Sequence, residues 1–540
     1  MVSGNNHAET TDTSAQAASD NPDNAIDPDT QKASAYSWYV LGVLVLLYVL
    51  NFIDRNIIAI LAEDIKKDMG LDDSQIGFLY GTAFGVFYAL FGIPLGKLAD
   101  SWHRVRLMTI GLTIWSAFTA LSGFARNFAT LSVARIGVGV GEATASPSAY
   151  SIISDYFPKR LRATALAIYS SGIYLGGGFS LFVGGKISSE WNSAFPVDPP
   201  LGLVGWQAAF VIVGLPGLLL ALWLVTLREP LRGQSDGILS PPVERPFAGF
   251  FAEMLAVIPP FTLLGAARQG ADGLRLNLIG LVGIALIALF LFLALGDWEQ
   301  WLALGIGYYA IWSWALQLRQ KDRPTFALIW GSPAFICTIL GYGAVAFSSY
   351  AVTLNAPIYA IRELGISQAQ AGLWIGGPGA LGGFLGITIG GRVADALKQT
   401  YCTGRLWVVI FGVVAPVIPL IIAFTTTNII LFYILNFLMS LFASSALGAA
   451  AATTQDLVLP RMRGVATATF FLATTLVGLS LGPYMVGKVS DMSGSLTTGV
   501  LSLLAVAPIG LVLLIIAVRQ LAQAEESVMQ RAIAAGEPAQ

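Results

Sequence analysis

The sequence is poor in charged residues, histidine and cysteine. Of its 540 residues only 11% are Asp, Glu, Lys or Arg, whereas soluble domains average about 25%. A soluble chain of this length needs more charge to cover its surface, so the composition excludes soluble globular and disordered proteins. The histidines are His7 and His103, and the cysteines are Cys337 and Cys402. Their number and spacing predict neither a metal site nor a disulfide framework.

Motifs for catalysis and for other kinds of transport are also missing. The sequence has no Gly-Lys-Ser or Gly-Lys-Thr, which excludes a P-loop and ATP-driven transport. Two histidines outside the apolar runs cannot complete a Ser-His-Asp site, and no filter loop or ring of charge indicates a channel. A net charge of −2 gives no surface for nucleic acid. We therefore expect no enzyme, no cofactor and no metal.

What the sequence has is long apolar runs. Apolar residues make up 55% of the chain, and the mean hydropathy is +0.70. Runs of 19–25 residues can each cross about 30 Å of hydrocarbon as a helix. They form two sets of six, near 37–59, 76–97, 107–125, 128–152, 164–185 and 206–227, and near 330–353, 369–391, 406–425, 428–452, 465–487 and 497–518.

The stretch between the two sets, 228–329, is unusual. After a charged, proline-rich linker, we expect an amphipathic segment at 246–266 and two further apolar runs at 276–296 and 300–318. If both runs span, the chain has fourteen spans arranged 6+2+6. The alternative is that one or both, being rich in Trp and Tyr, lie in the membrane interface. The predicted domains are a disordered acidic tail 1–35, a first bundle 36–228, a central segment 229–329, a second bundle 330–519 and a tail 520–540.

Basic residues are unevenly divided between the two sides of the predicted spans. If residues 1–35 are cytoplasmic, the cytoplasmic loops hold seventeen Lys and Arg residues and the opposite loops hold six. This positive-inside bias predicts that both termini are cytoplasmic. Residues 1–35 lack the apolar core of a signal peptide, so we expect the first span to be retained. We expect the bacterial inner membrane, because no eukaryotic sorting motif or glycosylation-rich loop is present.

The two sets of spans carry an internal repeat. Three motifs recur in the same order about 300 residues apart: GKLAD (96–100) and GRVAD (391–395), DYFPKRLR (155–162) and DLVLPRMR (456–463), and GKIS (185–188) and GKVS (487–490). Two parallel six-helix halves with substrate bound between them are the design of major facilitator transporters.

Several motifs support a family resemblance. GKLADSWHRVR (96–106) resembles the superfamily's loop signature between spans two and three, and RIGVGVGE (135–142) resembles its fourth-span signature. NFIDRNIIAI (51–60), GVGEATASPSAYSIISDYF (139–157) and GWQAAF (205–210) are similar to the spinster family of lysolipid and sphingolipid transporters. The resemblance implies an all-α polytopic membrane protein with the major facilitator fold. It also implies proton-coupled movement of an amphiphilic lipid, such as a lysophospholipid or sphingosine phosphate, by alternating access. We expect a monomer whose partners are this lipid, protons and the membrane lipids.

Four charged residues lie inside the predicted spans of the first half, where charge is costly and usually functional. Asp54 and Arg55 are in span one, whereas Arg135 and Glu142 are two turns apart on one face of span four. We hypothesise that Asp54 or Glu142, removed from water, binds a proton. Arg135 then neutralises whichever carboxylate is ionised or binds an anionic headgroup, and Arg55 pairs with Glu142 or a phosphate. The alternative is a static ion pair that holds the two spans together.

The spans of the second half are almost free of charge. No Asp, Glu, Lys or Arg occurs in residues 324–361, 406–455 or 464–487. One charged wall and one apolar wall suit an amphiphile whose headgroup binds the first half and whose chain lies along the second. Thr353 and Asn355 complete the predicted substrate contacts. The alternative is that these apolar faces only pack against each other or against lipid.

Further charges lie at the predicted cytoplasmic ends of the spans. The resemblance implies that they form ion pairs that latch the inner gate in the outward-open state. The predicted gating residues are Asp100, Arg104, Arg106, Asp155 and Arg162, with Arg392 and Asp395 as repeat counterparts. The alternative is a solvated loop that only follows the positive-inside rule.

The main rival function is a proton-coupled exporter of small hydrophobic drugs or organic anions. Competition by lysophospholipid, compared with competition by small aromatic anions, distinguishes this function from lipid transport. A lipid sensor of the same fold that does not transport is a third function, and a measured flux excludes it.

Overall fold

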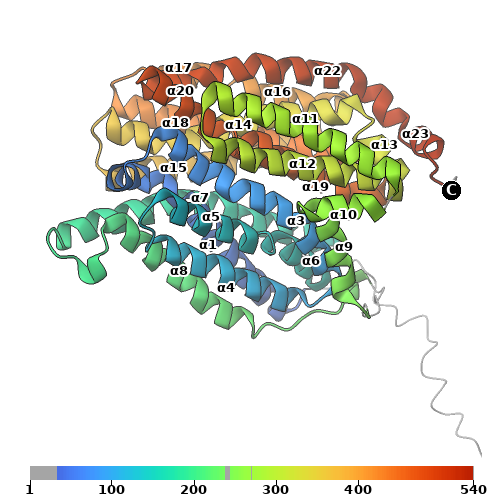
Figure 1. The fold of residues 1–540 in the computed structure, drawn as a ribbon, viewed down its shortest axis with the longest axis horizontal. Coiled ribbons are helices and arrows are strands. Elements are labelled where there is room, and N and C mark those ends of the chain that lie inside the picture. The colour runs from blue at the N-terminus through green and yellow to red at the C-terminus, as the bar shows by residue number, and fades with distance from the viewer. Residues whose placement is uncertain (1–32, 237–243, 269, 539–540) are drawn as a thin grey trace, which may run out of the picture.

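The computed structural model describes residues 33–236, 244–268 and 270–538, and every regular element in these ranges is a helix (Figure 1). Helices are expected because each backbone polar group in hydrocarbon needs an internal partner. Twelve of the described helical segments are long and apolar enough to cross a membrane, or thirteen if one bent pair counts as a span. Most of the predicted tail 1–35 lies outside the described residues.

The first half of the chain folds into one bundle. Its helices are α1 (Ala35–Met69), α2 (Asp73–Gly77), the π-helical turn η2 (Phe78–Thr82), α3 (Ala83–Ser101), α4 (Arg104–Ser122), α5 (Phe128–Glu142), α6 (Ala145–Tyr156), α7 (Lys159–Ala194) and α8 (Gly205–Leu224). Ala143 and Thr144, between α5 and α6, keep helical backbone angles. The predicted span 128–152 is therefore present as two consecutive helices, and the break follows directly after Glu142.

The second half forms a second bundle. Its helices are α14 (Pro333–Arg362), α15 (Gln368–Thr400), α16 (Gly404–Val414), α17 (Val417–Ala423), α18 (Ile429–Asp456), α19 (Arg463–Ala473), the π-helical turn η6 (Thr474–Leu479), α20 (Gly482–Ser493), α21 (Leu496–Leu501), α22 (Val506–Glu526) and α23 (Val528–Ala534). Helix α22 continues into the predicted tail 520–540 as far as Glu526. In Figure 1 the first bundle, in blue and teal, lies below the second, in orange and red.

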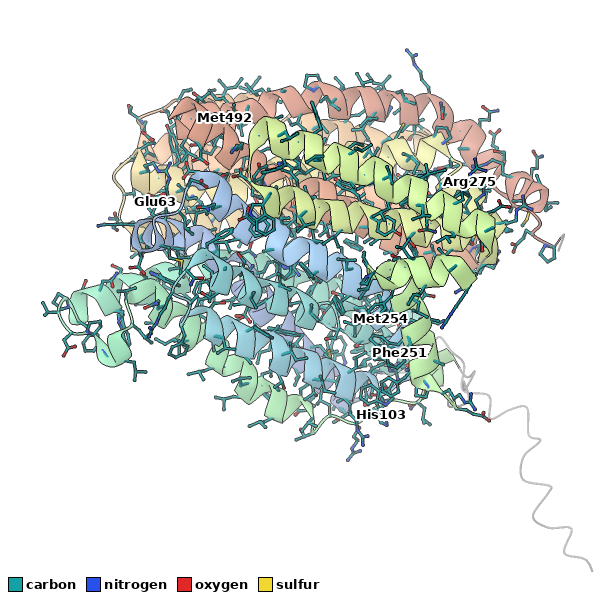
Figure 2. All side chains as sticks on the ribbon, in the orientation of Figure 1. Glu63, His103, Phe251, Met254, Arg275 and Met492 are labelled. Carbon is teal, nitrogen blue, oxygen red and sulfur yellow. The ribbon has the colours of Figure 1, made fainter. Side chains whose placement is uncertain are left out.

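The two ends of the molecule are defined here by the chain. The end where α1 begins and α22 finishes is called the terminal face, and the opposite end is called the distal face. In Figure 2, Glu63 and Met492 lie at the distal face, whereas His103 and Arg275 lie at the terminal face.

Ion pairs and hydrogen bonds join the two halves at the distal face. Arg362, the last residue of α14, places its Nη2 2.6 Å from Glu63 Oε1 and 2.7 Å from Asp73 Oδ1. Asp491 of α20 accepts hydrogen bonds from the backbone amides of Asp73 and Ser74 at 2.9 and 2.8 Å. A carboxylate at the beginning of α2 also matches the positive end of that helix. The distal face is therefore closed in this structure.

Helices α7 and α15 reinforce this closure by direct backbone contact. A Cβ atom added to Gly178 would lie 2.4 Å from the carbonyl oxygen of Gly376, and a Cβ on Gly376 would lie 2.4 Å from that of Gly178. Real Cβ atoms do not approach that closely, so both positions require glycine. Small residues at helix crossings allow such close approach in membrane proteins.

The central segment adds five helices between the halves. They are α9 (Pro246–Val257), α10 (Phe261–Arg268), α11 (Ala271–Leu295), α12 (Trp298–Lys321) and α13 (Arg323–Ile329). The predicted amphipathic segment 246–266 forms α9 and most of α10, which are bent by 102° relative to each other. Helices α11 and α12 lie side by side in Figure 1 and match the two inserted apolar runs. By length and hydropathy α11 qualifies as a span and α12 does not, so the 6+2+6 arrangement is not confirmed.

Helix α12 packs into the space between the two halves. Its Trp301 and Leu304 share one buried apolar cluster with Val86 and Leu90 of α3 and with Leu476 of η6. Because α12 contacts both α3 and η6, it fills the interface between the two halves on this side. It thereby separates the α3 side of the interface from the surroundings of the bundle.

Both ends of α12 are tied to the second half by polar contacts. At the distal face, Asp297 accepts hydrogen bonds from Lys488 Nζ at 2.8 Å and from the Tyr484 hydroxyl at 2.9 Å. At the terminal face, Arg461 Nη1 lies 2.8 Å from Asp322 Oδ2. The inserted helix is therefore attached at two levels to the same bundle.

Candidate functional site

Helices α1 and α5 bring the four predicted charged residues together in the interior. Arg55 Nη2 lies 2.7 Å from Glu142 Oε2, and Arg55 Nε donates a second hydrogen bond to the same oxygen at 3.2 Å. Asp54, Arg135 and Glu142 are at most 1% exposed, and Arg55 is 7% exposed. None of the four is turned outward to lipid, so they form one buried cluster.

Aromatic rings surround the Arg55 guanidinium. Its central carbon lies 4.6 Å from the ring centres of both Phe52 and Phe84, and 5.0 Å from that of Tyr88. Cation–π attraction is strongest where water is excluded. These rings therefore stabilise the positive charge while leaving Glu142 as its ionic partner.

Arg135 binds backbone rather than a carboxylate in this state. Its guanidinium donates hydrogen bonds to the carbonyl oxygens of Leu79, Asp54 and Arg55 at 3.2–3.3 Å. This links α5 to α1 and η2. The sequence predicted that Arg135 neutralises an ionised carboxylate, whereas here its donors go to main-chain oxygens beside the Asp54 and Arg55 side chains.

Asp54 is the least satisfied member of the cluster. Within the described residues its Oδ1 has no hydrogen-bond partner, and the Oε1 of Glu142 has none either. Trp115 and Thr119 of α4 lie beside Asp54. An ionised carboxylate is costly in such surroundings unless it is paired, and the neutral acid is less so. The position of Asp54 therefore suits a group that takes up and releases a proton.

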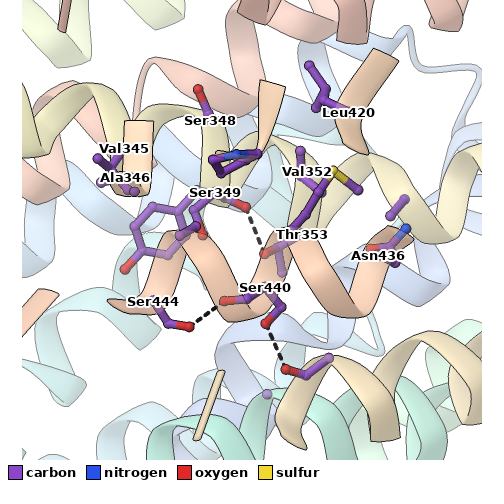
Figure 3. A pocket seen from close by; sticks show the side chains of 18 of the residues that line it. Val345, Ala346, Ser348, Ser349, Val352, Thr353, Leu420, Asn436, Ser440 and Ser444 are labelled. Atoms are coloured by element: carbon purple, nitrogen blue, oxygen red, sulfur yellow. Dashed lines mark hydrogen bonds between the residues drawn. The ribbon is translucent and has the colours of Figure 1, made fainter. Parts of the chain in front are cut away.

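A cavity of about 260 Å³ lies mainly within the second half. Its walls come from α1, α7, α14, α15, α18 and neighbouring helices, and Figure 3 shows the polar side chains Thr353, Ser440 and Ser444 among apolar ones. No group of three or more His, Cys, Asp or Glu side chains within the described part of the chain is arranged to hold a metal ion. The cavity therefore offers apolar surface with a few hydroxyl and amide groups.

Phe52 connects the charged cluster to this cavity. The ring that lies 4.6 Å from the Arg55 guanidinium carbon also belongs to a residue that lines the cavity. Asn56, one turn further along α1, lines the cavity too and accepts a hydrogen bond from the buried Tyr80 hydroxyl at 2.9 Å. The charged and apolar regions are thus adjacent.

Of the two substrate contacts that the sequence predicted in the second half, one lies on the cavity wall. Thr353 lines the cavity, and its hydroxyl donates to the carbonyl oxygen of Ser349. Asn355 is buried, donates to the carbonyl oxygen of Ala351 and is not a lining residue. Asn56 was not predicted, although its position next to Asp54 and Arg55 in NFIDRN, inside a span, was a signal for it.

Some of the predicted gating residues form ion pairs, each within one half of the chain. Arg104 binds both Asp155 and Glu229, with Nε 2.7 Å from Glu229 Oε1. In the second half, Arg405 binds Asp395 at 2.8 Å and Asp456 at 2.5 Å. Asp100, Arg106 and Arg392 are exposed at the terminal face, and Arg162 lies on α7. The predicted latch concerns a state with the terminal face closed, so it stays a prediction.

Two arginines with clear structural roles were missed. Arg405 is the repeat counterpart of Arg104, since both reach an aspartate two spans further along the chain: Asp155 and Asp456 are each 51 residues beyond their partners. The repeat itself was therefore a signal. Arg362 contacts residues 289 and 299 positions away, and no local pattern indicates such pairs.

Comparison with known proteins places these features in a family. The chain is 28% identical over 473 residues to an MFS-type efflux pump of Mycolicibacterium smegmatis, covering 87% of this chain and 89% of that protein. It is 24% identical over 538 residues to spinster homolog 1 of Xenopus laevis, covering 91% and 84%.

A solved structure shows the same architecture. The crystal structure of a bacterial homologue of the human lysosomal transporter Spinster, inward-facing and occupied, matches with a TM-score of 0.64 and 25% identity, covering 93% of this chain and 99% of that one. The sequence profile of the Major Facilitator Superfamily matches residues 44–356 and 338–532. The fold, the internal repeat and these matches agree: the chain belongs to the major facilitator superfamily and, like the spinster proteins it resembles, is a transporter and not an enzyme.

Proposed function

We propose that this transporter moves an amphiphilic lipid, of the lysophospholipid or sphingosine phosphate type, across the membrane. The observation that supports this most is that a buried charged cluster in one half lies next to an apolar cavity in the other. Phe52 contacts both. A headgroup and an acyl chain need these two surfaces next to each other. A small polar solute would leave the apolar cavity unused.

The proposed headgroup site is the Arg55 guanidinium. An anionic headgroup competes with Glu142 for Arg55, whose bond to Glu142 Oε2 measures 2.7 Å without substrate. When the headgroup displaces Glu142, that carboxylate loses its partner inside an apolar region, and proton uptake then lowers its cost. Substrate binding and proton binding are coupled in this way.

Asp54 and Arg135 supply the second part of the proposed coupling. The unpaired Oδ1 of Asp54 accepts a proton, and Arg135 moves from the carbonyl oxygens it binds here to whichever carboxylate is ionised. Each protonation state then favours a different packing of α1 against α5. Transport follows because the ligand and the proton bind the two states with different affinity.

The proposed membrane orientation places the terminal face in the cytoplasm of a bacterial cell, with both termini on that side. The distribution of basic residues supports the orientation, because the sequence has seventeen Lys and Arg residues in the predicted loops on this side and six in those on the other. The closed distal face then makes this structure an inward-facing state.

Reconstitution tests the proposed function. Purified transporter in proteoliposomes should move a fluorescent lysophospholipid faster under an imposed pH gradient than without one. Empty liposomes and a collapsed gradient are the controls. Lysophospholipid flux equal to that of empty liposomes would reject lipid transport, and flux that ignores the gradient would reject proton coupling.

A second candidate is proton-coupled export of small hydrophobic drugs or organic anions. The similarity to an efflux pump over 87% of the chain favours it. The same proteoliposomes separate the two functions, since unlabelled lysophospholipid should compete with the fluorescent lipid and small aromatic anions should not. The reverse order of competition would favour the drug or anion exporter.

A further inference from the structure

Two hydrogen-bond donors beside Asp54 have no partner. Trp115 Nε1 and Thr119 Oγ1 of α4 are buried, and within the described residues neither forms a hydrogen bond. The Oδ1 of Asp54 is unpaired in the same way, although both side chains lie next to its carboxyl group. Buried polar groups in folded proteins are nearly always hydrogen-bonded, so three unpaired polar atoms in one place need a physical reason.

The helices that carry these groups are in close contact. A Cβ atom added to Gly141 of α5 would lie 2.7 Å from the Trp115 backbone nitrogen, so α4 and α5 touch at this level. Arg135 of α5 donates to the Asp54 carbonyl oxygen at 3.2 Å, which holds α1 against the same helix. Trp115 and Thr119 are four residues apart and therefore share one face of α4. This face covers the Asp54 side chain.

The two donors differ in which form of Asp54 they can bind. All three side chains are at most 1% exposed, so each unpaired atom can be satisfied only by another member of the group. An indole N–H only donates, whereas a hydroxyl both donates and accepts. An ionised carboxylate only accepts, but the protonated acid turns one oxygen into a donor. Trp115 therefore suits the ionised form, and Thr119 can bind either form.

We propose that Trp115 and Thr119 are positioning residues for proton coupling, which donate hydrogen bonds to Asp54 when it is ionised. This inference rests on the proposed function, in which Asp54 takes up and releases the proton. Hydrogen bonds to an ionised acceptor are about twice as strong as those to a neutral one. Both donors therefore favour release of the proton, and they stabilise a carboxylate for which no ion pair is found within the described residues.

The charged and titratable groups nearest to Asp54 lie on other helices or follow it on α1. They are Arg55, Tyr80, Tyr88, Arg135, Glu142 and Tyr350. The sequence places no titratable side chain in α4 between 107 and 122 or in α8, and only tyrosines in α7 between 163 and 185. Helix α4 thus acts on Asp54 at this level through neutral donors, which can be removed without changing any charge.

The pH dependence of transport tests this role. Proteoliposomes containing the full chain take up a fluorescent lysophospholipid under a constant pH difference, set at a series of mean pH values. Thr119→Val keeps the branched shape and removes the hydroxyl, so Asp54 should hold its proton to higher pH. The midpoint of the profile should move up by about one pH unit. Thr119→Ser restores a hydroxyl and should restore the wild-type midpoint, and Trp115→Phe should shift the midpoint in the same direction as Thr119→Val.

A matched control lies on the same helix. The Ser116 hydroxyl is also buried and unpaired within the described residues, but it faces α8, where a Cβ on Gly217 would lie 2.0 Å from it. Ser116→Ala should therefore keep the wild-type midpoint. In an Asp54→Asn background, Thr119→Val should leave lipid exchange at equal pH unchanged, whereas a merely structural defect would slow it.

Separate outcomes decide the inference and the proposed function. A wild-type midpoint in Thr119→Val, an equal shift in Ser116→Ala, or slowed exchange in the Asp54→Asn background would overturn the role of the α4 donors while the proposed function stands. Wild-type uptake that matches empty liposomes, or that ignores the pH difference, would reject the proposed function and this inference with it. Thr119→Val carries the test by itself if Trp115→Phe folds poorly.

Discussion

At the scale of single residues, the buried cluster has two carboxylates in unlike surroundings. Each carboxylate has one oxygen without a hydrogen-bond partner within the described residues, but Glu142 is ion-paired with Arg55 at 2.7 Å, whereas no such ion pair is found for Asp54 there. Unlike surroundings give two acids unlike proton affinities. Asp54 is therefore the member whose replacement should affect coupling most directly.

Asp54→Asn should uncouple transport from the proton gradient. The amide keeps the size and polarity of the neutral acid but cannot exchange a proton, so uptake driven by the gradient should fall at least about tenfold while substrate exchange at equal pH continues. Fluorescent lipid flux in proteoliposomes measures both. Asp64→Asn on the same helix is the control, because Asp64 accepts hydrogen bonds from Ser188 and Gln368 that an asparagine oxygen can still accept. Gradient-driven uptake at the wild-type rate in Asp54→Asn would contradict the coupling role.

Glu142→Ala should destabilise the protein and make it dependent on anionic lipid. Removing one partner of a buried pair leaves the Arg55 charge uncompensated, at a cost of about 3 kcal/mol. An anionic lysolipid should restore part of the loss in detergent, and a nonionic detergent additive should not. Glu190→Ala, which breaks an exposed pair with Lys186, should change the thermal unfolding temperature little. Equal unfolding temperatures for Glu142→Ala with and without anionic lysolipid would contradict a headgroup site at Arg55.

At the scale of helices, irregularities occur where the two halves face each other and beside the buried charged cluster. The π-helical turns η2 and η6 lie in opposite halves, and a Cβ on Gly81 of η2 would be 2.2 Å from the carbonyl oxygen of Leu479 in η6. The break between α5 and α6 follows Glu142. Such interruptions are frequent at functional sites and allow helices to bend. Hydropathy predicted the spans but not these breaks, because the breaks depend on the neighbouring helices against which each span packs.

Gly178→Val should disfavour the closed distal face. The added side chain would meet the carbonyl oxygen of Gly376 at the α7–α15 crossing, which is backbone and cannot move aside alone. In a background without the native cysteines, a reporter cysteine at Ser490, which contacts Asp73 across the halves, should be labelled several-fold faster. Gly377→Ala is the control, since a Cβ there meets nothing within 4 Å. Labelling of the reporter at the same rate in both variants would show that this crossing does not hold the distal face closed.

At the scale of the whole molecule, the distal face depends on a small set of long-range ion pairs. Arg362 joins Glu63 and Asp73, and Asp491 binds the backbone at the beginning of α2. These contacts exist only while the distal face is closed. They therefore contribute to the free-energy difference between the two alternating states.

Arg362→Gln should shift the population toward the state with an open distal face. Loss of the two ion pairs, which are partly exposed, should change the equilibrium about tenfold. Labelling of a cysteine at Ser490 from the distal side measures the shift. Arg126→Gln changes an exposed distal arginine and should leave labelling unchanged. Equal labelling of Arg362→Gln and wild type would assign the closure to helix packing alone.

The inserted helix α12 should move with the second half during transport. Gly307 of α12 lies equally close to both halves, since a Cβ there is 3.3 Å from Leu476 and 3.4 Å from Val86. The polar anchors, however, join α12 to the second half through Lys488 and Arg461. A disulfide between cysteines at 307 and 476 should therefore preserve transport, whereas one between 307 and 86 should block it until reduced. The opposite result would place α12 with the first half.

The sequence by itself determined the membrane-spanning helices, the repeat and the residue types of the charged cluster. Each of these follows from local or periodic properties: twenty apolar residues must form a helix in hydrocarbon, and a buried charge such as Glu142 stands out by its cost. The spacing of Arg135 and Glu142 predicted their common face, because helical geometry is fixed.

Only the tertiary structure decided which charged side chains form ion pairs and where the cavity lies. The sequence left both Arg55 and Arg135 open as partners of Glu142, and the structure pairs Glu142 with Arg55. It likewise places Asn436 on the cavity wall and Asn355 away from it. The position of α12 against both halves likewise had no sequence signal. These features depend on how helices hundreds of residues apart rotate and approach. That arrangement is set by the summed packing of many side chains, so no single motif predicts it.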